Sequence, residues 1–155
     1  MDSSNSPSNL GICVIGLGWG HRHHVRNYAE MDDVDIYVCD LDPEKIAQTQ
    51  SEFAGAGAFA SVEEVLASDK VDAVDVALPH HLHRPVAVLA AEAGKHCMVE
   101  KPIALNLREA DEMLEAADRA GTRLAVAENY QFMADSTEAR RVIGSGLVGR
   151  VFMVR

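Results

Sequence analysis

Short apolar runs alternate with longer helical segments along almost the whole chain, and this alternation constrains the fold more than any other feature. The run Leu10–Ile15 is apolar and rich in β-branched residues and ends at a glycine, as is typical of a buried parallel strand. Strict alternation of strands and helices predicts a doubly wound α/β fold: a parallel sheet with helices on both faces, in the strand order 3-2-1-4-5-6. The other strands are predicted at Val34–Cys39, near Ala58–Phe59, and at Val71–Ala77, His96–Val99 and Leu124–Ala127.

Capping patterns predict where several helices begin. Asp42 stands before Pro43, so that an N-cap acceptor precedes proline at the first helical position. A capping residue followed three residues later by glutamate predicts three further helix starts: Ser61 with Glu64, Asn106 with Glu109, and Asp135 with Glu138. The first helix is predicted over His21–Met31 and the fourth over Pro85–Ala93.

The composition indicates one globular domain and excludes several classes of partner. Of 155 residues, 48% are hydrophobic and 25% charged. Acidic residues outnumber basic ones by 24 to 14, and a net charge of −10 argues against binding to nucleic acid or an anionic membrane. No apolar run approaches the roughly 18 residues of a membrane span. Residues 1–9 lack the basic and apolar regions of a signal peptide and are expected to form a disordered tail.

The cysteines point to a reducing compartment. Cys13, Cys39 and Cys97 form no paired motif, and each lies within an apolar run that is predicted to be a strand. Buried free thiols are typical of such positions, and we expect a cytoplasmic protein.

A glycine-rich segment joins the first strand to the first helix, where a dinucleotide's pyrophosphate would bind. Gly16 and Gly18 occupy the positions of the tight turn and of the closest backbone approach. His21 stands at the third fingerprint position, and Gly20 is expected to supply the close packing that a glycine gives there. The alternative to a pyrophosphate-binding loop is a turn in which glycine is needed only because the backbone adopts positive φ. The candidate cofactor contacts are Gly16, Leu17, Gly18, Trp19, Gly20 and His21.

Asp40 ends the second strand, 22 residues after Gly18. That is the position of the acid that binds the adenine ribose hydroxyls, and a carboxylate there repels a 2′-phosphate. Because neither Leu41 nor Asp42 offers a compensating positive charge, the pattern favours NAD over NADP. The alternative is an ordinary turn residue after a strand.

The same glycines also satisfy the G-x-G-x-G spacing of methyltransferases that bind S-adenosylmethionine. Such loops are usually preceded by an acid, whereas Val14 and Ile15 stand there in this chain. This alternative also gives no account of the motifs described next.

Two further motifs follow the fourth and fifth strands, Leu78-Pro79-His80-His81-Leu82-His83 and Glu100-Lys101-Pro102. Both are predicted to lie at the carboxyl edge of the sheet, beside its crevice. A lysine placed there next to an acid suits a catalytic acid–base or an anchor for a substrate hydroxyl. Burial beside a positively charged nicotinamide would lower the pKa of that amine. A surface turn with a salt bridge is the alternative for an isolated Glu-Lys-Pro.

Together these motifs resemble the Gfo/Idh/MocA oxidoreductase family, named for glucose–fructose oxidoreductase and inositol dehydrogenase. The resemblance covers nearly the whole chain from Leu10 and is most specific from Ala93 to Pro102. It also includes the glycine loop with His24 downstream, Asp40, Asp72-Ala73-Val74, Pro79, His83 and Asn129-Tyr130-Gln131-Phe132.

The resemblance implies a Rossmann domain that binds NAD(P), and hydride transfer at a hydroxyl-bearing carbon of a sugar, cyclitol or related polyol. It implies that Lys101 lies at the substrate and the nicotinamide ribose and that Glu100 lies near the nicotinamide. The chain departs from the family at Leu78, where threonine is common, and at His21. Further cofactor contacts are implied for Leu78, Pro79, His80, His83, Pro102, Asn129 and Gln131.

Family members carry a second α/β domain that supplies the substrate pocket and the oligomer interface. We therefore expect residues 10–147 to form the NAD-binding domain and residues 148–155, which read as the start of a strand, to begin a truncated second domain. On this view the second domain is absent, the chain is inactive by itself, and the full-length enzyme is a homo-oligomer. The alternative is a non-catalytic NAD-binding module or sensor.

Histidines cluster after the first and fourth strands, three in each place. Imidazoles facing each other across a crevice could bind zinc or nickel. No evident carboxylate or thiolate completes such a shell, so we predict no metal site.

Overall fold

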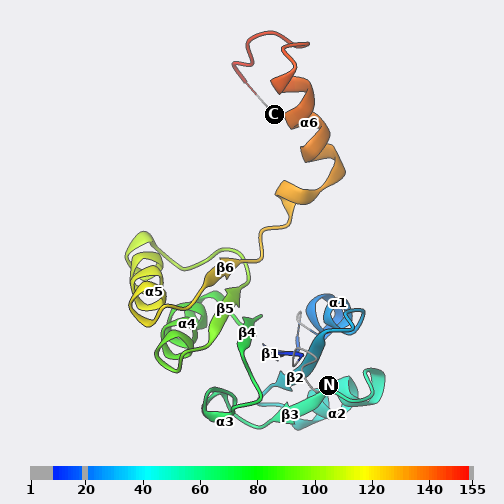
Figure 1. Ribbon diagram of the computed structural model, residues 1–155, viewed down its shortest axis with the longest axis vertical. Helices are drawn as coiled ribbons and strands as arrows, with labels where there is room; N and C mark the ends of the chain where they lie inside the picture. Colours follow the sequence, from blue (N-terminus) through cyan, green and yellow to red (C-terminus); the bar gives the residue numbers. More distant parts are fainter. Residues whose placement is uncertain (1–8, 19–20, 154–155) are drawn as a thin grey trace, which may run out of the picture.

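The computed structural model describes residues 9–18 and 21–153, and a parallel sheet forms its centre. The sheet order is β3-β2-β1-β4-β5-β6, which confirms the predicted order 3-2-1-4-5-6 (Figure 1). Every strand lies within two residues of its predicted place. The strands are β1 (Leu10–Ile15), β2 (Val34–Cys39), β3 (Gly57–Phe59), β4 (Ala73–Val76), β5 (His96–Val99) and β6 (Leu124–Val126).

Helical segments connect the strands. The predicted first helix is shorter than expected, because a π-helical turn at His21–Val25 leads into a single α-turn that ends at Tyr28. The α-helices are α1 (Arg26–Tyr28), α2 (Pro43–Glu52), α3 (Val62–Ala67), α4 (His83–Glu92), α5 (Leu107–Ala120) and α6 (Ala134–Gly144). Short 3₁₀ turns lie at His80–Leu82 and Tyr130–Phe132.

Two apolar clusters hold helices against the two faces of the sheet. Alternate residues of a strand point to opposite faces, so β1 sends Ile15 into one cluster and Val14 into the other. On one face, β4 and β5 pack against α3, α4 and α5, with Met113 of α5 fully buried. On the other face, β1 and β2 pack against Val25 and the partly buried Tyr28. Figure 1 shows α4 and α5 together on one side of the sheet, with α1 and α2 on the other.

Three of the four predicted helix caps are present. Asp135 is not a cap, because α6 begins one residue earlier and Asp135 accepts a hydrogen bond from the N–H of Ser136 instead. The confirmed caps are Asp42 accepting from Glu44 N, Ser61 accepting from Glu64 N, and Asn106 accepting from Glu109 N.

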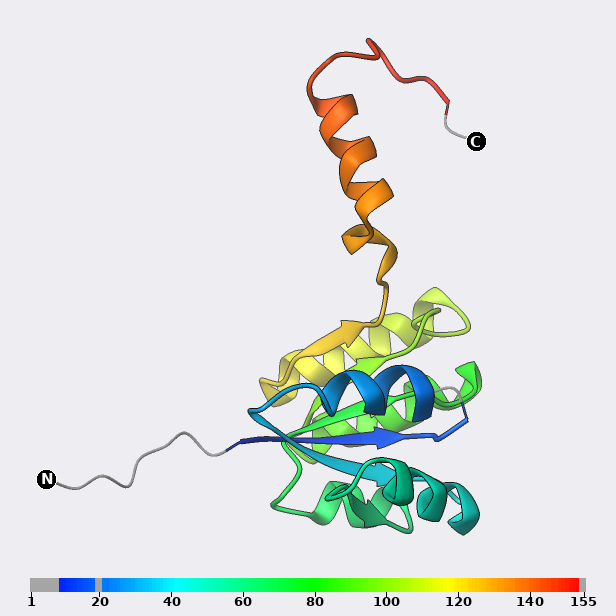
Figure 2. The same ribbon diagram turned by 90° about the vertical axis from the view of Figure 1, so that its right-hand side faces the viewer.

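After β6 the chain leaves the sheet, and α6 stands away from the rest of the molecule (Figures 1 and 2). No residue of α6 is buried, and Phe132, Leu147 and Phe152 are each about four-fifths exposed or more. The expected strand at 148–155 is not formed by its described part, residues 148–153. A strand requires a neighbour with which to pair, and this segment extends away from the sheet.

The described part of the chain contains no helix long and apolar enough to cross a membrane. The three cysteines are free and buried, as predicted. Burial raises the pKa of the Cys39 thiol to about 11 and that of Cys97 to about 12, so neither thiol is a reactive thiolate at neutral pH.

Candidate functional site

The predicted site segments meet at the carboxyl edge of the sheet. Ile15, the last residue of β1, lies beside Cys39 of β2 and Val76 of β4, and Val76 lies beside Val99 of β5. Backbone hydrogen bonds continue past the strand ends, since the N–H of Glu100 donates to the carbonyl of Val76 at 3.0 Å. The glycine turn, Asp40, the Leu78–His83 turn and Glu100-Lys101-Pro102 therefore share one edge, as the sequence predicted.

Gly16 makes the tight turn after β1. Its φ is +97°, a conformation that other residues rarely adopt, and a Cβ there would lie 2.5 Å from the carbonyl oxygen of Ala77. Gly18 differs, because a Cβ built on it meets no atom of the described residues within 4 Å, its chain neighbours aside. The next two predicted contacts, Trp19 and Gly20, lie outside the described residues, as does the side chain of His21.

Asp40 holds the glycine turn in place. Its Oδ2 accepts a hydrogen bond of 2.7 Å from the N–H of Leu17, and its Oδ1 accepts one of 2.9 Å from the N–H of Asp42. Lys45 Nζ lies 3.6 Å from the same Oδ1. Burial acts to raise the pKa of this carboxyl, but the two backbone donors and Lys45 outweigh it, and the pKa is lowered. Asp40 is therefore a carboxylate at neutral pH.

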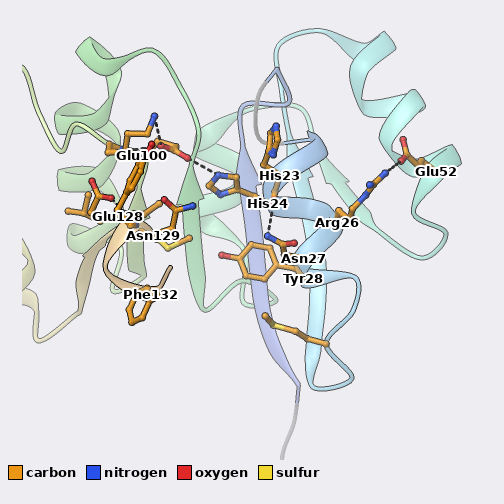
Figure 3. A pocket seen from close by; sticks show the side chains of 16 residues that line it. His23, His24, Arg26, Asn27, Tyr28, Glu52, Glu100, Glu128, Asn129 and Phe132 are labelled. Atoms are coloured by element: carbon orange, nitrogen blue, oxygen red, sulfur yellow. Dashed lines mark hydrogen bonds and ion pairs between the residues drawn. The ribbon is translucent and has the colours of Figure 1, made fainter. Parts of the chain in front are cut away.

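A buried histidine links the first helical segment to the ends of β4 and β5. His24 Nδ1 lies 2.7 Å from Asp75 Oδ2, and His24 Nε2 lies 3.0 Å from Glu100 Oε1. The Tyr28 hydroxyl donates to the same Asp75 oxygen at 2.8 Å. Figure 3 shows His24 between Glu100 on one side and Tyr28 on the other.

Asp75 is the least expected member of this group. It lies in the middle of β4 and is 1% exposed, with its two strand neighbours Val74 and Val76 in the opposite apolar cluster. Its side chain thus faces the helical segment that carries His24 and Tyr28. Asp75 Oδ1 is buried without a hydrogen-bond partner among the described residues. An acid inside an otherwise apolar predicted strand was the available signal in the sequence, but it did not show which way the side chain faces.

Glu100 and Lys101 occupy the mouth of the site. Glu100 Oε2 accepts a hydrogen bond of 2.9 Å from the N–H of Lys101, and Lys101 Nζ lies 4.0 Å from the same oxygen. The Lys101–Pro102 peptide bond is cis. The Lys101 side chain is 55% exposed, so the expected burial of its amine is not provided by the described residues.

His83 braces the two turns of this edge. Its Nε2 lies 2.9 Å from the carbonyl oxygen of Leu78, and its Nδ1 lies 3.0 Å from that of Pro102. The side chain has no exposed surface. Direct contact of His83 with a cofactor stays a prediction, whereas its contacts in the structure fix one turn against the other. Pro79 and His80 are exposed at this edge, and the rings of His80 and His83 lie 5.6 Å apart.

A cleft of about 1130 Å³ opens between the His24–Tyr28 segment and the ends of β5 and β6 (Figure 3). Three of the residues predicted to contact a cofactor line this cleft: Glu100, Lys101 and Asn129. Gln131 is not among the lining residues, and its amide donates to the carbonyl of Glu128 instead. Among the side chains that the structure describes, which do not include that of His21, no three His, Cys, Asp or Glu residues are arranged to hold a metal ion.

The chain is similar in sequence to known dehydrogenases. The D-apiose dehydrogenase of Paraburkholderia graminis is 31% identical over 92% of this chain and 38% of its own length. The scyllo-inositol 2-dehydrogenase (NADP(+)) of Bacillus subtilis is 33% identical over 85% of this chain and 40% of its own length.

Solved structures show the same fold. The WlbA dehydrogenase from Bordetella pertussis, in complex with NADH and UDP-GlcNAcA, superposes with a TM-score of 0.86 at 28% identity over 96% of this chain. A levoglucosan dehydrogenase in complex with NADH and levoglucosan gives a TM-score of 0.83 at 28% identity over 94% of this chain. The chain spans 43% and 42% of those two proteins.

The family match covers the whole sheet. Residues 10–128 match GFO_IDH_MocA, described as an oxidoreductase family with an NAD-binding Rossmann fold. This chain belongs to the Gfo/Idh/MocA family of oxidoreductases and contains its NAD-binding Rossmann fold.

Proposed function

We propose that this chain is the cofactor-binding half of a dehydrogenase that prefers NAD and oxidises a hydroxyl-bearing carbon of a sugar, cyclitol or related polyol. The observation that carries the proposal is the placement of Gly16, Asp40 and Glu100-Lys101 around one sheet edge with a cleft beside them. The relatives support the substrate class, since their names specify D-apiose, scyllo-inositol and levoglucosan.

The described residues fit a dinucleotide. The turn at Gly16 brings the backbone close against Ala77, and the side of Gly18 is open, so a pyrophosphate could approach the backbone there. Asp40 stands at the end of β2, where a ribose diol would be bound. When bound, NAD supplies the acceptor for a hydride.

The preference for NAD rests on Asp40. Its lowered pKa keeps it negatively charged, and a carboxylate repels the 2′-phosphate of NADP. Lys45 lies 3.6 Å from Asp40 and partly offsets this charge. One relative is named as an NADP(+) enzyme, so membership of the family does not decide between the two cofactors. The proposed preference for NAD therefore rests on the residues of this chain.

Lys101 is the proposed catalytic residue. Its amine is exposed to the cleft, so it can reach a substrate that lies there. As the carbon gives up its hydrogen with the bonding pair to bound NAD, Lys101 Nζ would accept the hydroxyl proton, having first released one of its own, and a carbonyl would form. Protonated Lys101 returns the proton in the reverse direction. Glu100, 4.0 Å away, keeps the amine near the cleft.

We further propose that residues 10–147 form the cofactor domain and that the chain from residue 148 leads into a substrate domain. The exposed apolar side chains of Phe132, Leu147 and Phe152 would then pack against the rest of a homo-oligomeric enzyme. Buried free thiols at Cys13, Cys39 and Cys97 support a reducing compartment, and we place the enzyme in the cytoplasm.

Calorimetric titration of this chain with NAD and, separately, with NADP tests the cofactor assignment. Saturable binding of both, with NAD the tighter, is the expected result. A folded chain that binds neither would contradict the proposal, and tighter binding of NADP would contradict the role of Asp40.

Lys101→Met separates chemistry from cofactor binding. The exposed amine is expected at the substrate and the nicotinamide ribose, so NAD affinity should fall by about tenfold at most, the loss of one charged hydrogen bond. In an enzyme that includes this domain, kcat should fall by about 10²–10⁴. An unchanged kcat would remove Lys101 from the reaction.

A further inference from the structure

Three side chains from three separate segments form a continuous row beside the cleft. His24 stands in the centre, with Asp75 of β4 at 2.7 Å from one ring nitrogen and Glu100, after β5, at 3.0 Å from the other. His24 is 8% exposed, Asp75 1% and Glu100 15%, so water competes little for any of the three.

The row must contain one proton more than a neutral imidazole between two ionised carboxylates would hold. An ionised carboxylate only accepts hydrogen bonds, and a neutral imidazole donates from one nitrogen alone. Two carboxylates can both be bonded only if His24 carries both ring protons, or if one carboxyl is itself protonated. Without that additional proton, a nitrogen lone pair would face a carboxylate oxygen across about 3 Å.

We propose that His24 is a positioning residue, a protonated bridge that ties Glu100 to Asp75 and thereby fixes Glu100-Lys101 at the cleft. The meaning of that position for hydride transfer rests on the proposed function above.

Electrostatics favours the doubly protonated imidazole. The hydrogen bond to Asp75 raises the pKa of His24, with a smaller contribution from Glu100, while burial opposes the shift. The Tyr28 hydroxyl is a second donor to the Asp75 carboxylate, after the His24 ring.

Three of the titratable groups around the row keep their own protons near neutral pH. Burial and the Asp75 charge raise the pKa of Tyr28, of Cys13 on β1 and of Cys97 on β5, so these three stay protonated. Lys101 faces the far oxygen of Glu100 at 4.0 Å, and His23 is the neighbour of His24 on its own turn.

The bridge reaches the cleft through Glu100. One Glu100 oxygen is held by His24, while the other accepts the backbone N–H of Lys101. With both oxygens occupied, Glu100 has one orientation, and the start of the Lys101 side chain is fixed with it. When His24 loses its proton, Glu100 is released and the mouth of the cleft loses this constraint.

NMR titration of the histidine-labelled chain measures the protonation of the His24 ring as a function of pH. The His24 signal is assigned because it is missing in the His24→Gln variant. We expect the His24 ring to stay protonated above about pH 6.5, where a free histidine is half neutral. Asp75→Asn and Glu100→Gln should each shift this titration to lower pH. If one of these variants does not fold, the titrations of the other variant and of the native chain still test whether His24 is a protonated bridge. A native His24 titrating at or below the value of free histidine, or an unshifted titration in the folded variants, would overturn the bridge.

The positioning role is measured by NADH binding across the same pH range. Native affinity should fall roughly tenfold as His24 loses its proton, about what the loss of one charged hydrogen bond would cause. In Asp75→Asn the loss of NADH affinity should occur at lower pH than in the native chain. In His24→Gln the affinity should no longer depend on pH over this range. His81→Gln, which removes an exposed histidine from the same edge, serves as the control and should keep the native profile.

A merely structural role would lower affinity in the His24 and Asp75 variants without moving the pH profile, and that result would overturn the proposal. A folded chain that binds no NADH at any pH would contradict the proposed function instead. In that case the NMR titration, which needs no cofactor, decides the bridge by itself.

Discussion

The carboxylate of Asp40 accepts a hydrogen bond of 2.7 Å from the backbone N–H of Leu17. The acid at the end of β2 therefore holds the glycine turn at the end of β1, in addition to any contact with a ribose. Cofactor preference and loop geometry depend on one side chain. A substitution there is expected to affect both.

Asp40→Ala should weaken NAD binding and reduce the preference for NAD over NADP. Loss of a charged hydrogen bond to a ribose hydroxyl costs about 1.5–3 kcal/mol, or roughly tenfold or more in affinity. The ratio of the two dissociation constants, measured by calorimetry, is the readout. Asp42→Ala is the matched control: it removes the cap of α2 at a cost of about 1 kcal/mol in stability and should leave the ratio unchanged. An unchanged ratio in Asp40→Ala would exclude Asp40 from the site.

Gly16→Ala and Gly18→Ala should separate folding from binding. At Gly16 the alanine combines a φ of +97° with a contact of 2.5 Å to the Ala77 carbonyl, and we expect a loss of about 2 kcal/mol or more in the free energy of unfolding. At Gly18 the new methyl group meets no atom within 4 Å in the part of the chain that the structure describes, apart from its chain neighbours. Its stability should therefore stay within about 0.5 kcal/mol, while NAD binding weakens because the methyl group stands where the backbone approaches phosphate.

For both glycine variants, urea denaturation measures the free energy of unfolding and calorimetric titration measures the affinity for NAD. Equal stability losses at the two positions would contradict the difference in local geometry. Full NAD affinity in Gly18→Ala would show that the cofactor does not approach this side of the loop.

His83→Leu should destabilise the chain and loosen the site together. The substitution removes the imidazole from between the carbonyl oxygens of Leu78 and Pro102, and we expect a loss of about 1–3 kcal/mol in the free energy of unfolding. His80→Leu, three residues earlier and exposed, should change stability by less than about 0.5 kcal/mol. Thermal unfolding of the two variants provides the comparison. If His83 acts only by touching the cofactor, His83→Leu would lose NAD affinity and keep its native stability.

The sequence predicts the fold well because its determinants are local. Each signal acts within a few residues: the apolar runs, the proline after Asp42, and the serine and asparagine caps. The alternation of strands and helices that they define leaves one common topology. The cap expected at Asp135 was wrong by two residues, because the N-cap of α6 is Met133; a helix start exposed to solvent is weakly determined.

The bridge through His24 could not be predicted in the same way. His24 is 51 residues from Asp75 and 76 from Glu100, and only the packing of the first helical segment on β4 brings them together. The face of the sheet to which Asp75 points depends on strand register, which a single sequence leaves open. The exposure of Lys101 likewise depends on which segments lie around it.

The stability of the chain should fall as pH rises through the His24 titration. The folded pKa of His24 is raised above the unfolded value of 6.5, so the folded state binds its proton more tightly than the unfolded state does. The resulting stabilisation is fully present below about pH 6.5 and is lost as the pH rises through the folded pKa. Urea denaturation between about pH 6 and pH 9 should therefore show a declining free energy of unfolding, and the decline should be smaller in His24→Gln. A native profile that rises over this range, or one that His24→Gln reproduces, would mean that the folded chain does not hold this proton.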